Sequence, residues 1–367
     1  VGIFTTKNGN INYSGNIVSA GLKAKGIINT GTGNTVNTGN INLTGDASIG
    51  IYGENGTSIT NAAGSVIEVG KGTYTGSIFD SAVGIYGKNA GSILNNGTVK
   101  IDRDAVGIYG ENTLITNTGS ILNAGGKNTG IYGIGQSVVN TGNIVLGDTS
   151  NGIFVKNGST VTNTGNITTG DSHSAGIYGT GTTSVQHNGG TITVGKSSAG
   201  IATENGNIDV MAGAGINAGI ESTYIYSAYG TGTSAATLAL SDYSIGMYTK
   251  AGSMTNTGTI TAGKSTVTAG LVKVSVGMAA ESGNLVNGGT INVPFDHGVG
   301  MVANNGGTAL NTGTINVGGS FAYGMQATKN STLINNGNIN VNGSSSRGMA
   351  ATNNSTVINN GNIQVNG

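Results

Sequence analysis

The chain has 367 residues with 15 basic and 15 acidic side chains, so its formal net charge is zero and only 8% of its residues are charged. That balance is unlike the basic surface of a nucleic-acid-binding protein, and the absence of cysteine excludes disulfides and thiolate metal sites. Glycine occupies 69 positions, which is incompatible with a largely helical fold.

A degenerate repeat runs through the whole chain. Each copy starts with Gly-Ile, which becomes Gly-Met in the second half, and reaches an Asn-x-Gly-x-Ile motif about ten residues later. Most copies are 22 to 24 residues apart, and a constant period of this length is typical of stacked repeats. The first glycines are Gly2, Gly26, Gly50, Gly84, Gly107, Gly130, Gly152, Gly176, Gly200, Gly246, Gly277, Gly300, Gly324 and Gly348, with Gly219 as a weak intermediate copy.

Each copy contains three short runs in which apolar and polar residues alternate. Such alternation, broken by Gly and Asn, predicts strands, and no run has helical spacing. Three strands per copy, stacked copy on copy, predict an all-β, right-handed parallel β-helix of about 15 coils. We expect one continuous β-helix segment over residues 1–367. It should belong to a longer protein, since neither end carries a capping sequence.

Two features of the first half are candidates for contact with a partner. Extra residues enter at 69–80, and we expect this loop to present Lys71, Tyr74 and Phe79. In six successive coils the second residue after the first glycine is aromatic, and alternation places these rings outside as an aromatic rail. The rail either shields the backbone or forms a platform for sugars or a partner protein. Its members are Tyr52, Tyr86, Tyr109, Tyr132, Phe154 and Tyr178.

The second half contains two further departures from the repeat. Residues 207–243 lose the Asn-x-Gly-x-Ile motif and are expected to be irregular, and a second expansion lies at 263–275. Loops that interrupt a regular scaffold commonly carry function. The candidate partner-binding residues here are Tyr224, Tyr226, Tyr229 and Tyr243.

Two columns of identical side chains are expected inside the coils. The residue after the first glycine is Ile in the first half and then methionine, which predicts a stacked core column. The asparagines of the second motif should stack at a corner and hydrogen-bond along the column, and we expect the glycine that follows to supply a positive φ there. The methionines are Met247, Met278, Met301, Met325 and Met349.

The segments GIYGENG, GIYGKNAGSILNNGTV and repeated NTGNI resemble passenger repeats of large fusobacterial type V autotransporter adhesins of the RadD type. The resemblance covers essentially the whole chain. It implies a passenger at the bacterial cell surface that adheres to protein or glycan receptors on bacteria or host cells. It also implies attachment to the outer membrane through a C-terminal β-barrel that this sequence does not include.

No arrangement of residues indicates catalysis, a metal site or a cofactor. The carboxylates are scattered. Of the three histidines, His173 and His187 are expected on different sides of one coil and His297 five coils away, so we do not expect a shared metal site. We therefore expect a non-enzymatic adhesin segment. Two alternatives stay open: a carbohydrate-active β-helix enzyme, which needs carboxylates that converge in a groove, and a purely mechanical spacer.

Overall fold

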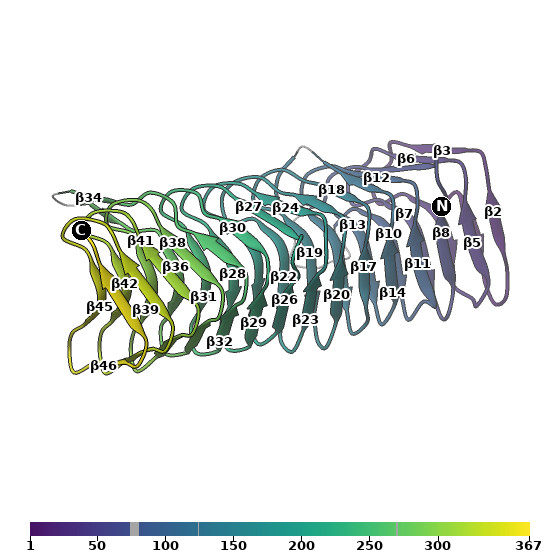
Figure 1. The fold of residues 1–367 in the computed structure, drawn as a ribbon. Helices are drawn as coiled ribbons and strands as arrows, with labels where there is room; N and C mark the ends of the chain where they lie inside the picture. The colour runs from purple at the N-terminus through teal and green to yellow at the C-terminus, as the bar shows by residue number, and fades with distance from the viewer. Residues whose placement is uncertain (74–80, 124, 269–270) are drawn as a thin grey trace. The chain divides into compact units, whose positions relative to one another are not determined.

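The computed structural model describes residues 1–73, 81–123, 125–268 and 271–367. In these ranges the chain is all-β and forms the right-handed parallel β-helix of about 15 coils that the repeat predicted (Figure 1). No helix in the described ranges is long and apolar enough to cross a membrane. The structure divides into two compact units, residues 1–184 and 185–367. The expectation of a single continuous segment stays a prediction.

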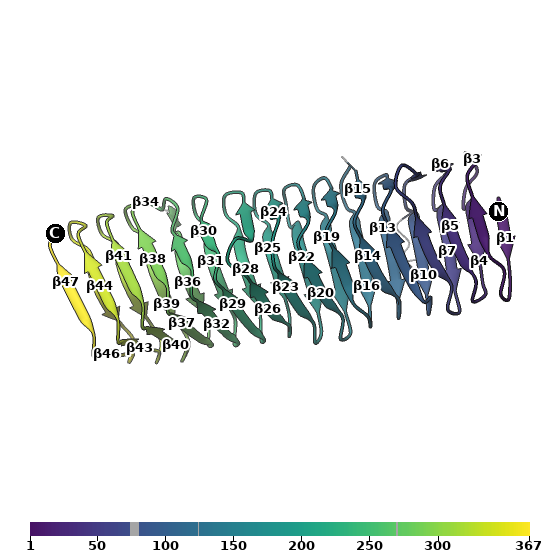
Figure 2. The same cartoon turned by 45° about the vertical axis from the view of Figure 1, so that its right-hand side comes forward.

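Unit 1 consists of coils whose strands form three parallel sheets. Each strand pairs with its equivalent one repeat away, as Figure 2 shows for neighbouring strands of the first sheet. The first sheet contains β1 (Ile3–Thr5), β4 (Lys25–Asn29), β7 (Ile49–Glu54), β10 (Val83–Lys88), β13 (Val106–Glu111), β16 (Thr129–Ile134), β19 (Asn151–Lys156) and β22 (Ala175–Thr180). The second contains β2 (Ile11–Tyr13), β5 (Asn34–Asn37), β8 (Ser58–Asn61), β11 (Ser92–Asn95), β14 (Leu114–Asn117), β17 (Val138–Asn140) and β20 (Thr160–Asn163). The third contains β3 (Asn16–Ser19), β6 (Asn40–Leu43), β9 (Val66–Val69), β12 (Thr98–Ile101), β15 (Ser120–Leu122), β18 (Asn143–Val145) and β21 (Asn166–Thr168).

Unit 2 repeats this arrangement, and the division between the units falls within β23 (Ser184–His187). Its first-sheet strands are β25 (Ala199–Thr203), β28 (Thr223–Ser227), β31 (Ile245–Thr249), β36 (Val276–Ala280), β39 (Val299–Ala303), β42 (Tyr323–Ala327) and β45 (Arg347–Ala351). The second-sheet strands are β26 (Asn207–Val210), β29 (Thr231–Ser234), β32 (Ser253–Asn256), β37 (Asn284–Asn287), β40 (Thr308–Asn311), β43 (Thr332–Asn335) and β46 (Thr356–Asn359). The third strands are β24 (Thr191–Val194), β27 (Gly215–Ala218), β30 (Thr237–Ala239), β33 (Thr259–Thr261), β38 (Thr290–Val293), β41 (Thr314–Val317), β44 (Asn338–Val341) and β47 (Asn362–Val365).

The residue after the first glycine of each copy points into the coil, as predicted. In unit 1, Ile51, Ile85 and Ile108 are fully buried and lie opposite one another in the first sheet. In unit 2, the methionines pair in the same way. Met247 to Met325 are completely buried, and only Met349 is partly exposed. Unbranched methionine side chains therefore fill the core as a continuous column.

The predicted asparagine column is confirmed in both units. In unit 1, Asn37 donates from Nδ2 to Oδ1 of Asn61, and this bond repeats coil by coil as far as Asn163, with N–O distances of 2.7–2.9 Å. Unit 2 contains the same ladder from Asn256 to Asn359, at 2.8 Å. Other residues occupy this slot in earlier coils of unit 2, namely His187, Val210 and Ser234.

The expected reason for glycine at the same corner is wrong. Gly119 and Gly142 do not have a positive φ. Instead, a Cβ atom on Gly119 would lie 2.0 Å from the carbonyl oxygen of Gly97, one coil away. Glycine is needed there because the backbones of successive coils approach closely. Positive φ values occur mainly at polar turn residues such as Asn55 and Asn157, where short side chains tolerate them.

The expectation that residues 207–243 are irregular is also wrong. They form regular strands, and Ile225 pairs with Ile201 on one side and Met247 on the other. This coil therefore starts at Tyr224, not at Gly219, and a tyrosine occupies the position of the first glycine. The repeat was hard to recognise in the sequence because the first glycine and the Asn-x-Gly-x-Ile motif are replaced here. The inward-pointing apolar residues that define a coil, such as Ile225, are still present.

The expansion at 263–275 is an antiparallel hairpin, β34 (Thr266–Thr268) paired with β35 (Leu271–Lys273), which lies outside the stack of coils (Figure 1). The hairpin is inserted between the third strand of one coil and the first strand of the next. For the expansion at 69–80, residues 74–80 lie outside the described residues.

Candidate partner-binding surfaces

The aromatic rail in unit 1 is a continuous stack of rings. Parallel pairing sets each ring one strand spacing from the next, so centroid distances are close to 5 Å. They are 5.0 Å for Tyr52–Tyr86, 4.7 Å for Tyr86–Tyr109, 5.2 Å for Tyr109–Tyr132 and 4.8 Å for Tyr132–Phe154, with planes inclined by 12–28°. Tyr178 ends the stack with a ring tilted by 55°.

The middle of the rail is covered by its neighbours. Tyr86 is 2% exposed and Tyr109 is 4% exposed, because both pack against an outward-facing row that includes Val83 and Val106. Tyr52 and Tyr132 are partly buried beside them. An open platform along the whole rail is therefore excluded. The shielding interpretation fits its centre, and only the less buried rings remain accessible to a partner.

A row of alternating charges follows the rail at its edge. Lys88 lies in register with Glu54 and Glu111, and its Nζ is 3.9 Å from Glu111 Oε1. The Tyr52 hydroxyl donates to Glu54 Oε2 at 2.7 Å, and the Tyr109 hydroxyl donates to Glu111 Oε2 at 3.3 Å. These carboxylates serve as hydrogen-bond acceptors and ion-pair partners on the coil surface.

The pKa values of three rail tyrosines, Tyr52, Tyr86 and Tyr109, are raised above the ordinary value. Burial, assisted by the negative charges of Glu111 and Glu54, raises the pKa of Tyr86 to about 12. Burial is also the main cause that raises the pKa of Tyr52 and of Tyr109. The raised pKa values favour the neutral phenol, and the hydroxyls of Tyr52 and Tyr109 donate to the carboxylates beside them.

The four tyrosines selected from residues 207–243 do not form one site. Tyr224 is buried, so its selection as a partner-binding residue is wrong. Tyr226 is partly buried and stacks on Tyr248 at 5.4 Å, whereas Tyr229 is 56% exposed beneath the Lys250 ammonium group. Tyr243 lies at a turn with φ of 60° and contacts the hairpin, with its hydroxyl 3.0 Å from Thr266 Oγ1.

The selected loop at 69–80 can be placed only in part. Lys71 is exposed, and its carbonyl oxygen accepts a hydrogen bond from the Ala47 amide at 2.9 Å. Tyr74 and Phe79 lie outside the described residues.

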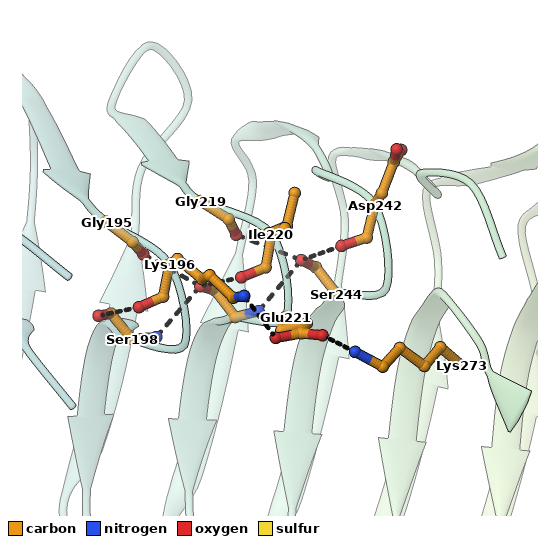
Figure 3. Close-up of polar contacts among 10 residues, drawn as sticks. Gly195, Lys196, Ser198, Gly219, Ile220, Glu221, Asp242, Ser244 and Lys273 are labelled. Carbon is orange, nitrogen blue, oxygen red and sulfur yellow. Dashed lines mark hydrogen bonds and ion pairs between the residues drawn. The ribbon is translucent and has the colours of Figure 1, made fainter. Parts of the chain in front are cut away.

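A polar cluster in unit 2 was not anticipated from the sequence (Figure 3). Glu221 lies between Lys196, at 3.5 Å, and Lys273 of the hairpin. The hydrogen bond from Lys273 is the main cause that lowers the pKa of the Glu221 carboxyl. These contacts hold the hairpin against a turn that lies more than one coil earlier in the chain.

Next to this cluster, a column of serines connects successive turns of unit 2 through hydrogen bonds from backbone amides to serine hydroxyls. The Ser198 amide donates to Ser222 Oγ at 3.1 Å, and the Ser222 amide donates to Ser244 Oγ at 3.2 Å. The Ser244 amide in turn donates to Ser275 Oγ at 3.2 Å. Serine two residues before the first glycine recurs at the repeat period, so this column could have been found from the sequence.

Within the described ranges, no group of three or more His, Cys, Asp or Glu residues is placed so that it could hold a metal ion. Several turn aspartates instead accept amide hydrogen bonds from the next coil, as Asp148 does from Asp171 and Asp296 from Ser320. His187 is buried with Nε2 3.0 Å from the Gly215 carbonyl oxygen, whereas His297 stacks on Phe321.

Comparison with known proteins gives one match, a family model described as the BigA third pectate lyase-like domain, over residues 135–323. No curated protein and no solved structure matches the chain. The match and the coiled repeats fit a bacterial surface protein built from β-helix repeats. Because the matched residues make up more than half of the sequence, the chain belongs to the family of the BigA third pectate lyase-like domain.

Proposed function

We propose that this chain is a non-enzymatic segment of a bacterial cell-surface adhesin that binds protein or glycan receptors on other bacteria or host cells. Its passenger-like repeats further suggest a type V autotransporter of the outer membrane, similar to the fusobacterial RadD type. The family match supports a surface β-helix, and the repeat resemblance supplies the adhesive role.

One observation carries this proposal: many of the charged groups are engaged in holding neighbouring coils together. Glu111 pairs with Lys88, Glu221 pairs with Lys196 and Lys273, and Asp242 accepts the Lys264 amide at 3.0 Å. Acid–base catalysis requires a carboxylate held near its substrate with a tuned pKa. These carboxylates serve structural contacts, which favours a scaffold that binds.

The test is a binding and turnover experiment on the purified chain. Beads coated with the chain are presented to bacterial cells, host cells and a glycan array, and acidic polysaccharides are assayed in parallel for loss of chain length. We expect saturable binding and unchanged polysaccharides. Depolymerisation that falls when carboxylates are neutralised would support the enzyme instead, and no saturable binding to any surface would support the mechanical spacer.

A further inference from the structure

A groove of about 540 Å³ lies on the outer face of the first sheet in unit 2, beside the hairpin. We refer to it as the hairpin groove. Val267 and Val272 of the hairpin line it, with Val276 and Val299 of the first sheet. Phe321, Tyr323 and Arg347 line it on the side of the later coils, and its other lining residues are Val274, His297, Val302 and Gln326.

The apolar lining of the groove is exposed at the hairpin and at Phe321 and is buried at the first sheet. Val272 is 70% exposed, Phe321 is 55% exposed and Val267 is 42% exposed. Val276 and Val299 belong to a buried cluster against which Tyr323 packs, so the apolar surface continues from the sheet to the hairpin. Contiguous exposed apolar surface of this kind, with polar groups at its edge, is typical of interaction sites.

The hairpin offers unpaired backbone groups beside this surface. β34 and β35 form a sheet of two strands, and no other strand in the described ranges pairs with either outer edge. Unpaired N–H and C=O groups at a sheet edge can accept another strand. The contacts of Lys273 with Glu221 and of Tyr243 with Thr266 hold the hairpin in place, so such an edge would be preorganised.

The charge of the groove is set by one residue. Among the described residues that line it, which also include His297, Arg347 is the only Lys, Arg, Asp or Glu. Its guanidinium lies 5.4 Å from the centre of the Tyr323 ring, and Nη1 donates to the Tyr323 hydroxyl at 2.9 Å. Arg347 is exposed and forms no ion pair within the described residues, which leaves further N–H donors free for a carboxylate.

We propose that the hairpin groove binds an extended peptide segment of a partner protein. The segment adds a third strand to the hairpin and places alternate apolar side chains against Val272, Val276 and Phe321. It places a carboxylate on Arg347. Open strand edges favour a peptide over a fatty acid, which has an apolar body and an anionic end but cannot use backbone groups. This inference does not rest on the adhesive role.

The test uses the purified chain and a fluorescent synthetic peptide in which Val and Thr alternate around one Glu. We expect saturable binding by fluorescence anisotropy. N-methylation of alternate backbone amides should weaken binding at least tenfold, because it removes the donors of the added strand. The unmodified and methylated peptides have the same side chains, so this comparison isolates strand addition from apolar contact.

Variants of the chain locate the site. Arg347→Gln should weaken the Glu peptide at least fivefold but leave its Gln analogue unchanged, and Val272→Thr should weaken both. Val145→Thr, at an exposed valine of unit 1, is the matched control and should have no effect. Circular dichroism checks that each variant is folded. Equal binding of the N-methylated peptide, displacement by dodecanoate, or unchanged affinity in both groove variants would overturn the proposal.

Discussion

A single asparagine of the inner column serves two neighbouring coils. Asn117 accepts a hydrogen bond from Asn95 Nδ2 and donates one to Asn140 Oδ1, both at 2.7 Å. Asn117→Leu therefore leaves a buried donor and a buried acceptor without partners. We expect it to lower the free energy of unfolding by about 2–4 kcal/mol, as measured by urea unfolding followed by circular dichroism. Asn143→Leu, at an exposed position, should change it by less than about 0.5 kcal/mol. Equal losses in the two variants would contradict this role.

The raised pKa of Tyr86 should make the stability of the folded chain decrease at alkaline pH. The pKa of Tyr86 in the folded chain is about 12, above its ordinary value of 10.0, so folding favours the neutral phenol. This contribution is complete below pH 10 and is lost as the pH rises from 10 to about 12. We expect the thermal midpoint of the wild type to fall over this interval, and to fall less in Tyr86→Phe. Tyr229→Phe, at an exposed ring, should follow the wild type. Parallel curves for Tyr86→Phe and the wild type would contradict this explanation.

At the residue scale, the sequence predicted what depends on alternation and period. The asparagine ladder and the methionine column follow from which face a residue occupies, and both are confirmed. The burial of Tyr86 and Tyr109 did not follow from alternation. Strict alternation would put Val83 and Val106 on the inner face with Ile85 and Ile108, but they pack on the outward-facing tyrosines instead. The repeat therefore predicted the direction of the rings, whereas their exposure depends on a local break in the alternation that brings these valines beside them.

At the scale of the strand, Tyr224 interrupts the third sheet. The third-sheet ladder ends at β27, and a new one starts at β30. The Tyr224 hydroxyl accepts a hydrogen bond from the Ser241 amide at 2.9 Å and donates to the Ala239 carbonyl oxygen at 2.7 Å. A large side chain where other coils have glycine thus separates the strands, and its hydroxyl satisfies backbone groups at the break.

Removal of that hydroxyl tests its role. Tyr224→Phe leaves the Ser241 amide and the Ala239 carbonyl without this partner, and we expect a loss of about 1–3 kcal/mol of unfolding free energy. Hydrogen exchange at the Ser241 amide should become faster. Tyr226→Phe changes a partly buried ring of the same strand and should leave that exchange rate unaltered. Unchanged protection of Ser241 in Tyr224→Phe would show that the hydroxyl does not bridge the break.

The hairpin is an element whose attachment depends on Glu221. Glu221→Gln removes the charge shared with Lys196 and Lys273, so we expect faster hydrogen exchange in β34 and β35 with little change in the global unfolding midpoint. Because the folded-state pKa of Glu221 is lowered, the same loosening should occur in the wild type as the pH falls through that lowered pKa, below the ordinary carboxyl range. Glu281→Gln, at the carboxylate that accepts from Tyr248, is the control. Hairpin exchange that is insensitive to both Glu221→Gln and acid would contradict this attachment.

The expansion at 263–275 was visible in the sequence, but its form was not. A change in period shows that residues have been inserted, whereas hairpin pairing and the contact with Glu221 depend on which side chains meet across coils. At 207–243 the prediction from the sequence failed in a different way, because the loss of the Asn-x-Gly-x-Ile motif was interpreted as a loss of regular structure. Ile225 kept the inward position there, so the coil persisted without its usual glycine.

At the scale of the whole molecule, stability should belong to contacts between neighbouring coils. A whole coil of unit 2 can therefore be removed in register. Thr314 lies opposite Asn338, so deletion of residues 314–337 joins Gly313 to Asn338 and brings Met301 over Met349 and Asn311 over Asn359. We expect the shortened chain to keep its β-sheet circular dichroism and to unfold cooperatively at a slightly lower urea midpoint.

Deletion of residues 314–325, about half a coil, is the matched comparison. It removes β41 and Tyr323–Met325 of β42 but leaves β43, so the columns of the remaining coils no longer align over one another. We expect loss of cooperative unfolding in this variant. If both deletions were tolerated equally, vertical stacking would not be the source of stability.

The whole-coil deletion also separates the functional alternatives, because it removes Phe321 and Tyr323 from the hairpin groove. Cell binding that survives it unchanged places the receptor site elsewhere, whereas loss of peptide binding alone assigns the peptide to the groove.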